Sequence, residues 1–377
     1  MNTFDEIIDR TESGCQKWDK YKNTDVIPMW VADMDFKSPP AIIDTLKKRV
    51  EHGVFGYTSV DLETDRAVVD FIERHYNWKI ESNWIVWIDG VVPAMNIACR
   101  SVSTKDVIIN TPIYPHFVKA PKNTNKNIIK VPMIEKDKRW TVDFEDFESK
   151  ITPDCKLFMF CNPYNPGGTV FRKDELEKLS SIIIKHDLTI CSDEIHSDLI
   201  LNPEVKHIPI ASLNKNIQNR SITLYAPSKT FNIAGIQSSF AIIPNLNMRK
   251  NFKREMAGII GDINIFAIVA TKTAYTLCDD WLEEVRDYLR NNLQIVQKFV
   301  EKYPQIKLLD QDATYLAWID VSKLNLDNPY EYFLSYGVGL SDGEPFGDKN
   351  FIRLNFGTTK ELLKEGLKRI ENGLKNL

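Results

Sequence analysis

Short apolar runs alternate with stretches of helical pattern between about residues 84 and 245, and this alternation limits the possible fold more than any other feature of the chain. One intervening helix is clear at Asp174–Lys185, where Leu176, Leu179 and Ile183 share a face. Such repetition predicts an α/β fold with a mostly parallel sheet and helices on both faces. The expected strands are Trp84–Ile88, Val107–Ile109, Lys156–Cys161, Leu188–Cys191, Ile222–Tyr225 and Ser239–Ile243.

The chain has 377 residues, which is more than one hydrophobic core usually serves, so two domains are expected. A long amphipathic helix is indicated beyond residue 279, and strand-like runs follow at Tyr315–Ile319 and Phe351–Phe356. We therefore expect a large domain over residues 41–278. Residues 1–40 and 279–377 are expected to form a smaller α+β domain.

Composition excludes several classes of partner. The 48 basic and 52 acidic residues are spread along the chain, so neither a nucleic acid nor an anionic membrane is expected to bind. No signal-peptide pattern and no apolar run of membrane-spanning length occurs, which predicts a cytoplasmic protein. The six cysteines include no CxxC pair, and reduced, structural thiols are expected.

Three short motifs follow expected strands in a fixed order: Asn165–Gly168, Asp193–His196 and Ser228–Thr230. In parallel sheets, ligands bind at the carboxyl ends of the strands, where these motifs fall. Pyridoxal 5'-phosphate (PLP) needs a lysine amine for a Schiff base, a carboxylate for its pyridine nitrogen, donors for its 3'-oxygen and a phosphate cup. The motifs supply these groups and predict PLP as cofactor, with an amino acid as the small-molecule substrate.

Lys229 is the predicted Schiff-base lysine. Apolar residues on both sides would enclose its stem, and desolvation lowers the pKa of an amine. A lysine beside a serine is, on its own, more typical of a solvated surface. Asp193 ends a strand, where an unpaired carboxylate would cost several kcal/mol. A pyridinium partner would remove that cost, although a helix-capping role is an open alternative.

His196 and Asn165 are candidate donors to the 3'-oxygen, with a structural histidine and an ordinary turn as the alternatives. Gly90, Val91 and Val92 precede Pro93 at an expected helix start, whose backbone N–H groups would hold a phosphate.

Two further residues are candidates. Tyr114 follows a strand and could stack on the cofactor ring, or belong to the core. Arg353 is a charge within an apolar strand, where a substrate α-carboxylate could be its acidic partner.

Rival motifs fail. Gly339–Gly343 matches the GxSxG elbow of hydrolases, but the last histidine of the chain, His207, precedes it. Lys229–Thr230 lacks the glycines of a P-loop. HExxH is absent and no metal site is expected.

Longer segments resemble a known family. The chain is similar to fold-type I PLP enzymes of the class I/II aminotransferase family, and within it to the cystathionine β-lyase (cysteine-S-conjugate β-lyase) branch. The segments that carry the resemblance are Ile27–Phe36, His52–Tyr57, Gly90–Ala94, Ser192–Leu199 and Ala226–Gly235.

This resemblance implies a homodimer with shared active sites, in which Tyr57 would reach the neighbouring subunit and serve as a candidate catalytic residue. It also implies that Val31 and Ala32 close over a substrate carboxylate held by Arg353. The general aminotransferase pattern has an arginine for the phosphate where this chain has Gln237. The lyase branch shares that change, which leaves the phosphate cup more dependent on Ser228 and on residues 90–92.

The activity implied is a PLP-dependent carbon–sulfur β-lyase acting on L-cystathionine or related cysteine S-conjugates, with thiol, pyruvate and ammonia as products. An amino-acid aminotransferase on the same scaffold is the first alternative. A regulatory protein that acts through a protein partner is the second.

Overall fold

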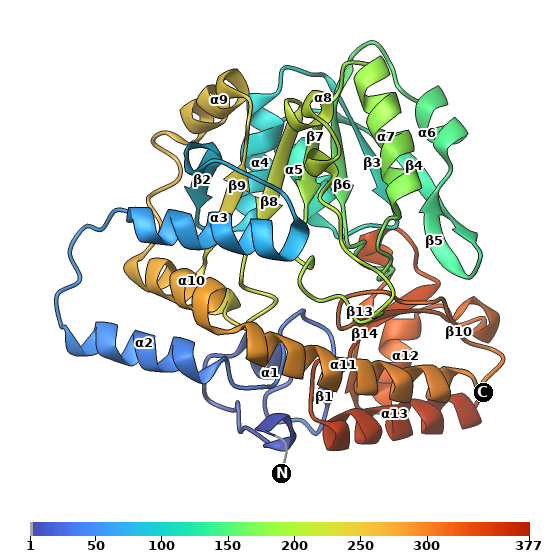
Figure 1. Ribbon diagram of the computed structural model, residues 1–377. Coiled ribbons are helices and arrows are strands. Elements are labelled where there is room, and N and C mark those ends of the chain that lie inside the picture. Colours follow the sequence, from blue (N-terminus) through green and yellow to red (C-terminus); the bar gives the residue numbers. More distant parts are fainter. Residues whose placement is uncertain (1–2) are drawn as a thin grey trace.

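The computed structural model describes residues 3–377, and its centre is an eight-stranded mixed sheet (Figure 1). The strand order is β2-β9-β8-β7-β6-β3-β4-β5. Strands β8, β7, β6, β3 and β4 run parallel, while β9, β2 and β5 pair antiparallel to their neighbours. The strands are β2 (Ile85–Ile88), β3 (Asp106–Thr111), β4 (Asn127–Lys136), β5 (Arg139–Val142), β6 (Cys155–Cys161), β7 (Thr189–Asp193), β8 (Ser221–Tyr225) and β9 (Ser239–Ile242).

The predicted α/β class is confirmed, and all six expected strands form. The β4–β5 hairpin was not expected. Only alternate residues of β4, such as Val131 and Met133, are buried, because the hairpin forms one edge of the sheet. A search for continuous apolar runs therefore passes over it.

Helices cover both faces of this sheet. On one face lie α4 (Val91–Ser101), α5 (His116–Asn123) and α9 (Leu246–Met256), packed on the sheet through an apolar cluster. On the other lie α6 (Phe144–Ser149), α7 (Lys173–Lys185) and α8 (Lys215–Gln218). Helix α7 is the one expected at Asp174–Lys185, and its Leu176, Leu179 and Ile183 are buried as predicted.

A second sheet is formed by the C-terminal part of the chain (Figure 1). Its order is β10-β11-β14-β13, all antiparallel. The N-terminal segment joins this unit, because Ile27 and Pro28 (β1) pair in parallel with Val338 and Gly339 (β12). The remaining elements here are α1 (Gln16–Asp19), β10 (Lys307–Leu308), β11 (Leu316–Asp320), α12 (Pro329–Ser335), β13 (Ser341–Asp342), β14 (Phe351–Asn355) and α13 (Lys360–Lys375).

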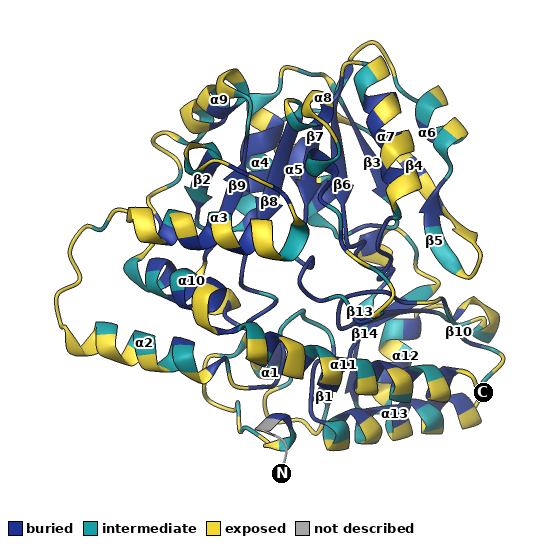
Figure 2. Ribbon diagram, in the orientation of Figure 1, coloured by how far each residue is buried: buried dark blue, intermediate teal, exposed yellow. Residues whose placement is uncertain are grey.

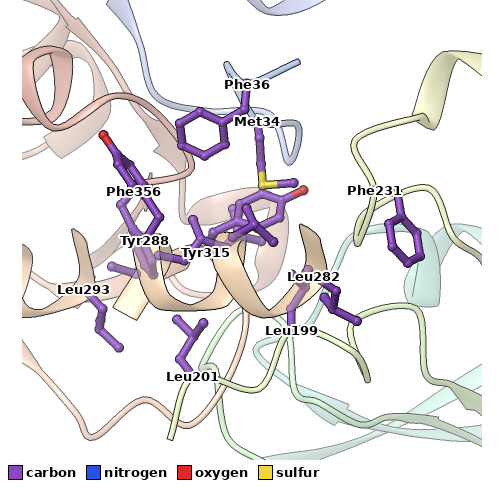
Figure 3. Packing of buried hydrophobic residues seen from close by; sticks show 14 of the residues in the cluster. Met34, Phe36, Leu199, Leu201, Phe231, Leu282, Tyr288, Leu293, Tyr315 and Phe356 are labelled. Carbon is purple, nitrogen blue, oxygen red and sulfur yellow. The ribbon is translucent and has the colours of Figure 1, made fainter. Parts of the chain in front are cut away.

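Four helices connect the two sheets: α2 (Pro40–Glu51), α3 (Leu62–Tyr76), α10 (Ile265–Leu277) and α11 (Asp279–Val300). The expected long amphipathic helix is α11. Its buried face packs against side chains from distant parts of the sequence (Figure 3). The labelled residues of α11 are Leu282, Tyr288 and Leu293, and those around it are Met34, Phe36, Leu199, Leu201, Phe231, Tyr315 and Phe356.

The connection between α2 and α3, residues 52–61, extends away from the body of the molecule at the left edge of Figure 2 and is largely exposed. Its apolar side chains point to solvent: Val54 is 63% and Phe55 56% exposed, and Tyr57 is fully exposed. Exposed apolar residues grouped in this way typically mark a contact with another protein.

The N-terminal segment is fixed by a group of charged residues. Lys17 is 1% exposed, and its Nζ lies 2.7 Å from Oδ2 of Asp35. Arg10 pairs with Asp33 at 2.9 Å and with Asp35 at 2.7 Å. The side chain of Asn232, from the loop after β8, bonds both the N–H and the carbonyl oxygen of Met34. Residues 33–35 are therefore held in one position beside the large sheet.

All six cysteines are free, and five of them are buried. Burial raises the pKa of the Cys99 thiol to about 12 and those of Cys155 and Cys278 to about 11. Among residues 3–377, no helix is long and apolar enough to cross a membrane. Within the same residues, no group of three or more histidine, cysteine or acidic side chains is placed to hold a metal ion.

Candidate active site

A cavity of about 910 Å³ opens at the carboxyl ends of the central strands and extends to the C-terminal sheet. It is lined by twelve of the thirteen residues that the sequence singled out, and Tyr57 is the exception. The twelve are Val31, Ala32, Gly90, Val91, Val92, Tyr114, Asn165, Asp193, His196, Ser228, Lys229 and Arg353.

Lys229 lies in the loop that follows β8, between Tyr225 at the end of that strand and the buried Phe231 and Ile233. Its Nζ donates a hydrogen bond to the carbonyl oxygen of Ala32 at 2.6 Å. Burial lowers the pKa of Lys229 to about 8. A substantial fraction of the amine is therefore neutral near pH 8, and a neutral amine is the form that attacks an aldehyde.

Asp193 is the last residue of β7, and it is buried. The N–H of Ile195 donates to its Oδ1 at 3.1 Å, but the carboxylate forms no ion pair with any side chain in residues 3–377. Burial raises the pKa of Asp193 to about 7. A cationic ring nitrogen would supply the missing charge partner, and Asp193 would in turn keep that nitrogen protonated.

The neighbouring Glu194 serves a different purpose. Its carboxylate is fully buried and accepts hydrogen bonds from Tyr225 at 2.5 Å, His207 at 2.7 Å and Ser192 at 2.8 Å. Successive side chains of a strand point to opposite faces. Asp193 consequently points into the cavity while Glu194 belongs to a hydrogen-bonded core behind it.

His196 and Asn165 offer hydrogen-bond donors inside the cavity. Burial, together with the charges of Lys229 and Arg353, lowers the pKa of His196 to about 3, so its imidazole is neutral. Its Nδ1 is buried and has no hydrogen-bond partner in the part of the chain that the structure describes. The Oδ1 atom of Asn165 accepts from Nη1 of Arg353 at 3.0 Å, which leaves the amide N–H₂ free to donate elsewhere.

Gly90 caps the N-terminus of α4, and Gly90, Val91 and Val92 present the first turn of this helix to the cavity. The positive end of a helix and its unpaired N–H groups suit a phosphate. Ser228 and Gln237 line the same cavity.

Arg353 lies in the middle of β14 and is buried. Burial lowers the pKa of its guanidinium to about 10. Its Nη2 donates to the carbonyl oxygen of Trp30 at 3.1 Å and to Oγ of Ser341 at 3.3 Å, and the Phe346 ring lies 4.6 Å from its Cζ. No carboxylate within residues 3–377 pairs with it, so this buried cation suits an anionic ligand.

The segment that carries Val31 and Ala32 is held over Arg353 by a second side chain of the same strand. Nδ2 of Asn355 donates to the carbonyl oxygens of Val31 at 2.6 Å and Asp33 at 2.7 Å. Val31 and Ala32 therefore form a wall of the cavity next to the arginine.

Two aromatic candidates have different positions. Tyr114 is half-buried in the cavity wall, and its ring centroid lies 5.1 Å from that of His116. Tyr57 lies on the exposed 52–61 connection, and within one chain it is not brought to the cavity.

Several cavity residues were given no role from the sequence: Lys20, Trp30, Ser341, Asp342 and Phe346. Trp30 stands inside the segment Ile27–Phe36 that carried the family resemblance, which is a usable signal. The others come from short segments, among them the two-residue strand β13, whose arrangement depends on the tertiary fold.

The polar groups of the cavity fit PLP. Within residues 3–377, the cavity holds a buried carboxylate without an ion pair, a buried imidazole nitrogen without a hydrogen-bond partner and a lysine of lowered pKa. These are the groups that the ring nitrogen, the 3'-oxygen and the aldehyde of PLP require. Each is buried at some cost unless a ligand completes its interactions.

Comparisons with known proteins agree with this geometry. Residues 24–370 match the family model for class I and II aminotransferases. The chain is 38% identical over 385 aligned residues to cystathionine beta-lyase PatB of Bacillus subtilis, and the alignment covers 98% of this chain and 99% of that protein.

Solved structures of high similarity have PLP in their descriptions. Cystalysin from Treponema denticola, described as containing a PLP cofactor, superposes with a TM-score of 0.96 at 35% identity, covering 100% of this chain and 99% of the other. The PLP-bound C-S lyase from Staphylococcus hominis has a TM-score of 0.92 at 31% identity, with 98% and 97% covered.

Proposed function

Because this chain belongs to the class I and II aminotransferase family, has the PLP-dependent fold type I and takes PLP as its cofactor, we propose that it is a carbon–sulfur β-lyase. Its proposed substrates are L-cystathionine or related cysteine S-conjugates, which it converts to a thiol, pyruvate and ammonia. The observation that carries the choice is the full-length similarity to a protein named as a cystathionine β-lyase.

The residues that would hold the cofactor are those of the cavity. Lys229 would bind its aldehyde, Asp193 its pyridine nitrogen, and His196 and Asn165 its 3'-oxygen. Tyr114 would lie against its ring. Its phosphate would be held by the first turn of α4 (Gly90, Val91 and Val92) and by Ser228.

When bound, PLP draws electrons from the Cα atom of an amino acid and so makes its proton acidic. Arg353 would hold the α-carboxylate through the N–H groups that its own hydrogen bonds leave free, among them the buried Nε, and so fix which Cα bond is exposed to reaction. Nζ of Lys229, with a pKa of about 8, would then take the proton from Cα as general base.

After loss of this proton, a Cα=Cβ double bond would form as the Cβ–S bond breaks. The sulfur would leave as a thiolate that takes up a proton from water, and a further water would hydrolyse the remaining unsaturated amino acid to pyruvate and ammonia. Trp30 and Val31 would shield this part of the cavity from water, because Ser341 and Arg353 bond the carbonyl oxygen of Trp30. Asn355 bonds that of Val31. Transaminases use the same proton removal, so the polar groups described above suit both reactions.

The proposal includes a homodimer in which the 52–61 connection packs on the neighbouring subunit. The support is the exposure of Val54, Phe55 and Tyr57 in the single chain. Tyr57 would then reach the partner's cavity as a catalytic residue. We also propose a cytoplasmic location, which suits six unpaired cysteines, without a nucleic-acid or membrane partner.

The test is an absorbance scan of the PLP-loaded protein during addition of L-cystathionine, with pyruvate and free thiol assayed in the same tube. Equal amounts of pyruvate and thiol, in excess over enzyme, are expected. Conversion of the cofactor to its pyridoxamine form without release of thiol would instead identify a transaminase. Full biological activity of a Lys229→Ala variant would identify a regulatory protein.

A further inference from the structure

Three aromatic rings surround a lysine at the outer end of the active-site cavity. Nζ of Lys20 lies 4.6 Å from the ring centroid of Trp30 and 5.2 Å from those of Tyr21 and Tyr330. It also donates a hydrogen bond to the Tyr330 hydroxyl at 3.2 Å. Lys20, Trp30 and Tyr330 all line the cavity.

These contacts position the ammonium group without neutralising it. Cation–π contacts attract a cation to the ring faces but contribute no counter-charge. No carboxylate among residues 3–377 forms an ion pair with Lys20, whereas Arg10 and Lys17 of the same N-terminal segment both pair with Asp35. Lys20 is therefore a pre-positioned cation with its charge still available to a ligand.

Trp30 connects this lysine to the carboxylate-binding arginine. The carbonyl oxygen of Trp30 accepts a hydrogen bond from Nη2 of Arg353 at 3.1 Å, and its indole ring faces Lys20. The indole Nε1 donates to the carbonyl oxygen of Lys17 at 3.1 Å, which fixes the ring. Lys20 and Arg353 thus lie in one cavity, on either side of a residue that contacts both.

An acidic residue accompanies Lys20 in the cavity wall. Asp342 follows Ser341, whose Oγ donates to the carbonyl oxygen of Trp30 at 2.8 Å. Oδ1 of Asp342 accepts from the N–H of Glu344 at 3.0 Å, and the carboxylate has no cationic partner among residues 3–377. Outside the group formed by Lys229, Asp193 and Arg353, the cavity wall therefore carries Lys20 and Asp342, of opposite charge and neither in an ion pair within residues 3–377.

We propose that Lys20 and Asp342 bind the far end of a zwitterionic substrate, Lys20 its distal carboxylate and Asp342 its distal ammonium group. This inference rests on the proposed lyase function and narrows the substrate class. The group attached to sulfur, which leaves as the thiol, is then itself an amino acid. S-alkyl cysteines, which lack these charges, leave both side chains without partners.

The test compares three substrates that share a three-carbon chain on sulfur: L-cystathionine, S-carboxypropyl-L-cysteine, which lacks the distal ammonium, and S-propyl-L-cysteine, which lacks both charges. Lys20→Met is expected to lower kcat/KM about tenfold for the first two and to leave the third within about twofold. Asp342→Asn is expected to lower kcat/KM about fivefold for L-cystathionine alone. The control is Lys22→Met, an exposed lysine two residues away that does not line the cavity, and it should change none of the three.

A binding measurement separates this inference from the lyase assignment. Calorimetry with the PLP-loaded protein uses L-aminosuberate, which carries the distal carboxylate but no sulfur, and L-aminoheptanoate, which lacks that carboxylate. Lys20→Met should weaken only the former. An equal loss for both ligands, or no loss for either, would overturn the role of Lys20. Absence of thiol release from every substrate would overturn the lyase assignment while leaving this binding result interpretable.

Discussion

Nζ of Lys229 donates a hydrogen bond to the carbonyl oxygen of Ala32, 197 residues earlier in the chain, at 2.6 Å. The amine proposed to react with PLP is thus directed toward the N-terminal segment that forms a wall of the substrate cavity. A substitution that moves Ala32 should therefore change the reactivity of the Lys229 amine.

The reactivity of Lys229 can be measured directly. Because burial lowers the pKa of Lys229 to about 8, it should be the first lysine labelled when PLP and borohydride are added in limiting amounts at pH 8. Peptide mass mapping checks this, with the exposed Lys250 as the internal comparison. A Lys229→Ala variant should lose at least about a thousandfold in lyase rate while keeping its fold. Labelling spread evenly over the surface lysines would contradict the assignment.

The raised pKa of Asp193 predicts how the free energy of unfolding depends on pH in protein from which PLP has been removed. Burial raises the pKa of Asp193 from 3.8 to about 7, so the folded chain binds this proton more tightly than the unfolded chain. The resulting stabilisation is complete below about pH 4 and is lost as the pH rises through 7. Between pH 4 and 8, the free energy of unfolding of the wild type should fall by about 4 kcal/mol relative to Asp193→Asn. Urea unfolding at both pH values measures this difference. If the free energy of unfolding changes equally with pH in both proteins, the pKa of Asp193 is not raised.

Arg353→Lys tests the recognition of the α-carboxylate. Lysine keeps the charge but cannot contact Asn165 and Trp30 while presenting a planar pair of donors to the substrate. We expect KM for L-cystathionine to rise about a hundredfold, with a smaller effect on kcat. Steady-state kinetics measure both, and an unchanged KM would place the carboxylate elsewhere.

Mixing variants of Tyr57 and Lys229 tests whether the two subunits of the proposed dimer share their active sites. Two inactive proteins, Tyr57→Ala and Lys229→Ala, should recover activity when they are unfolded together and refolded as a mixture. Each mixed dimer would contain one cavity with an intact lysine and an intact tyrosine from its neighbour. Recovery to about a quarter of the wild-type rate is expected from random pairing. If light scattering shows a dimer but no activity is recovered, Tyr57 does not act in the partner's cavity.

Asp35→Asn tests the anchoring of the N-terminal segment. Burial alone would raise the pKa of Asp35, but the charges of Lys17 and Arg10 outweigh it and lower the pKa. Removing this charge leaves Lys17 buried without its closest partner, which costs about 3–5 kcal/mol. Thermal unfolding should show the loss, and KM should rise as residues 30–34 become less ordered. Asp44→Asn, at an exposed surface pair, is the matched control and should have little effect.

The parts of the fold and site that follow strand ends were predictable from sequence. Lys229, Asp193 and Asn165 each lie just after or at the end of a buried strand, and the carboxyl ends of parallel strands meet at one edge of a sheet. Arg353 was recognisable because a charge within an apolar strand needs a partner.

Other parts depend on contacts that no local pattern records. The β4–β5 hairpin is half exposed and lacks a continuous apolar run. Lys20 and Phe346 face the cavity only because the N-terminal segment pairs with β12 and the last sheet folds beside it. Tyr57 lies on the exposed 52–61 connection and not in the cavity of its own chain. The sequence of this connection has no helical or strand periodicity from which its path could be predicted.

The burial of five cysteines has a consequence for an enzyme whose proposed product is a thiol. Released thiols and their oxidised forms exchange with protein sulfur through thiolates that solvent can reach. In this chain, burial keeps the Cys99, Cys155 and Cys278 side chains in the thiol form and out of reach. With that proposed activity, the protein could accumulate the thiol without becoming trapped as a mixed disulfide, and of the six cysteines only the partly exposed Cys15 could react.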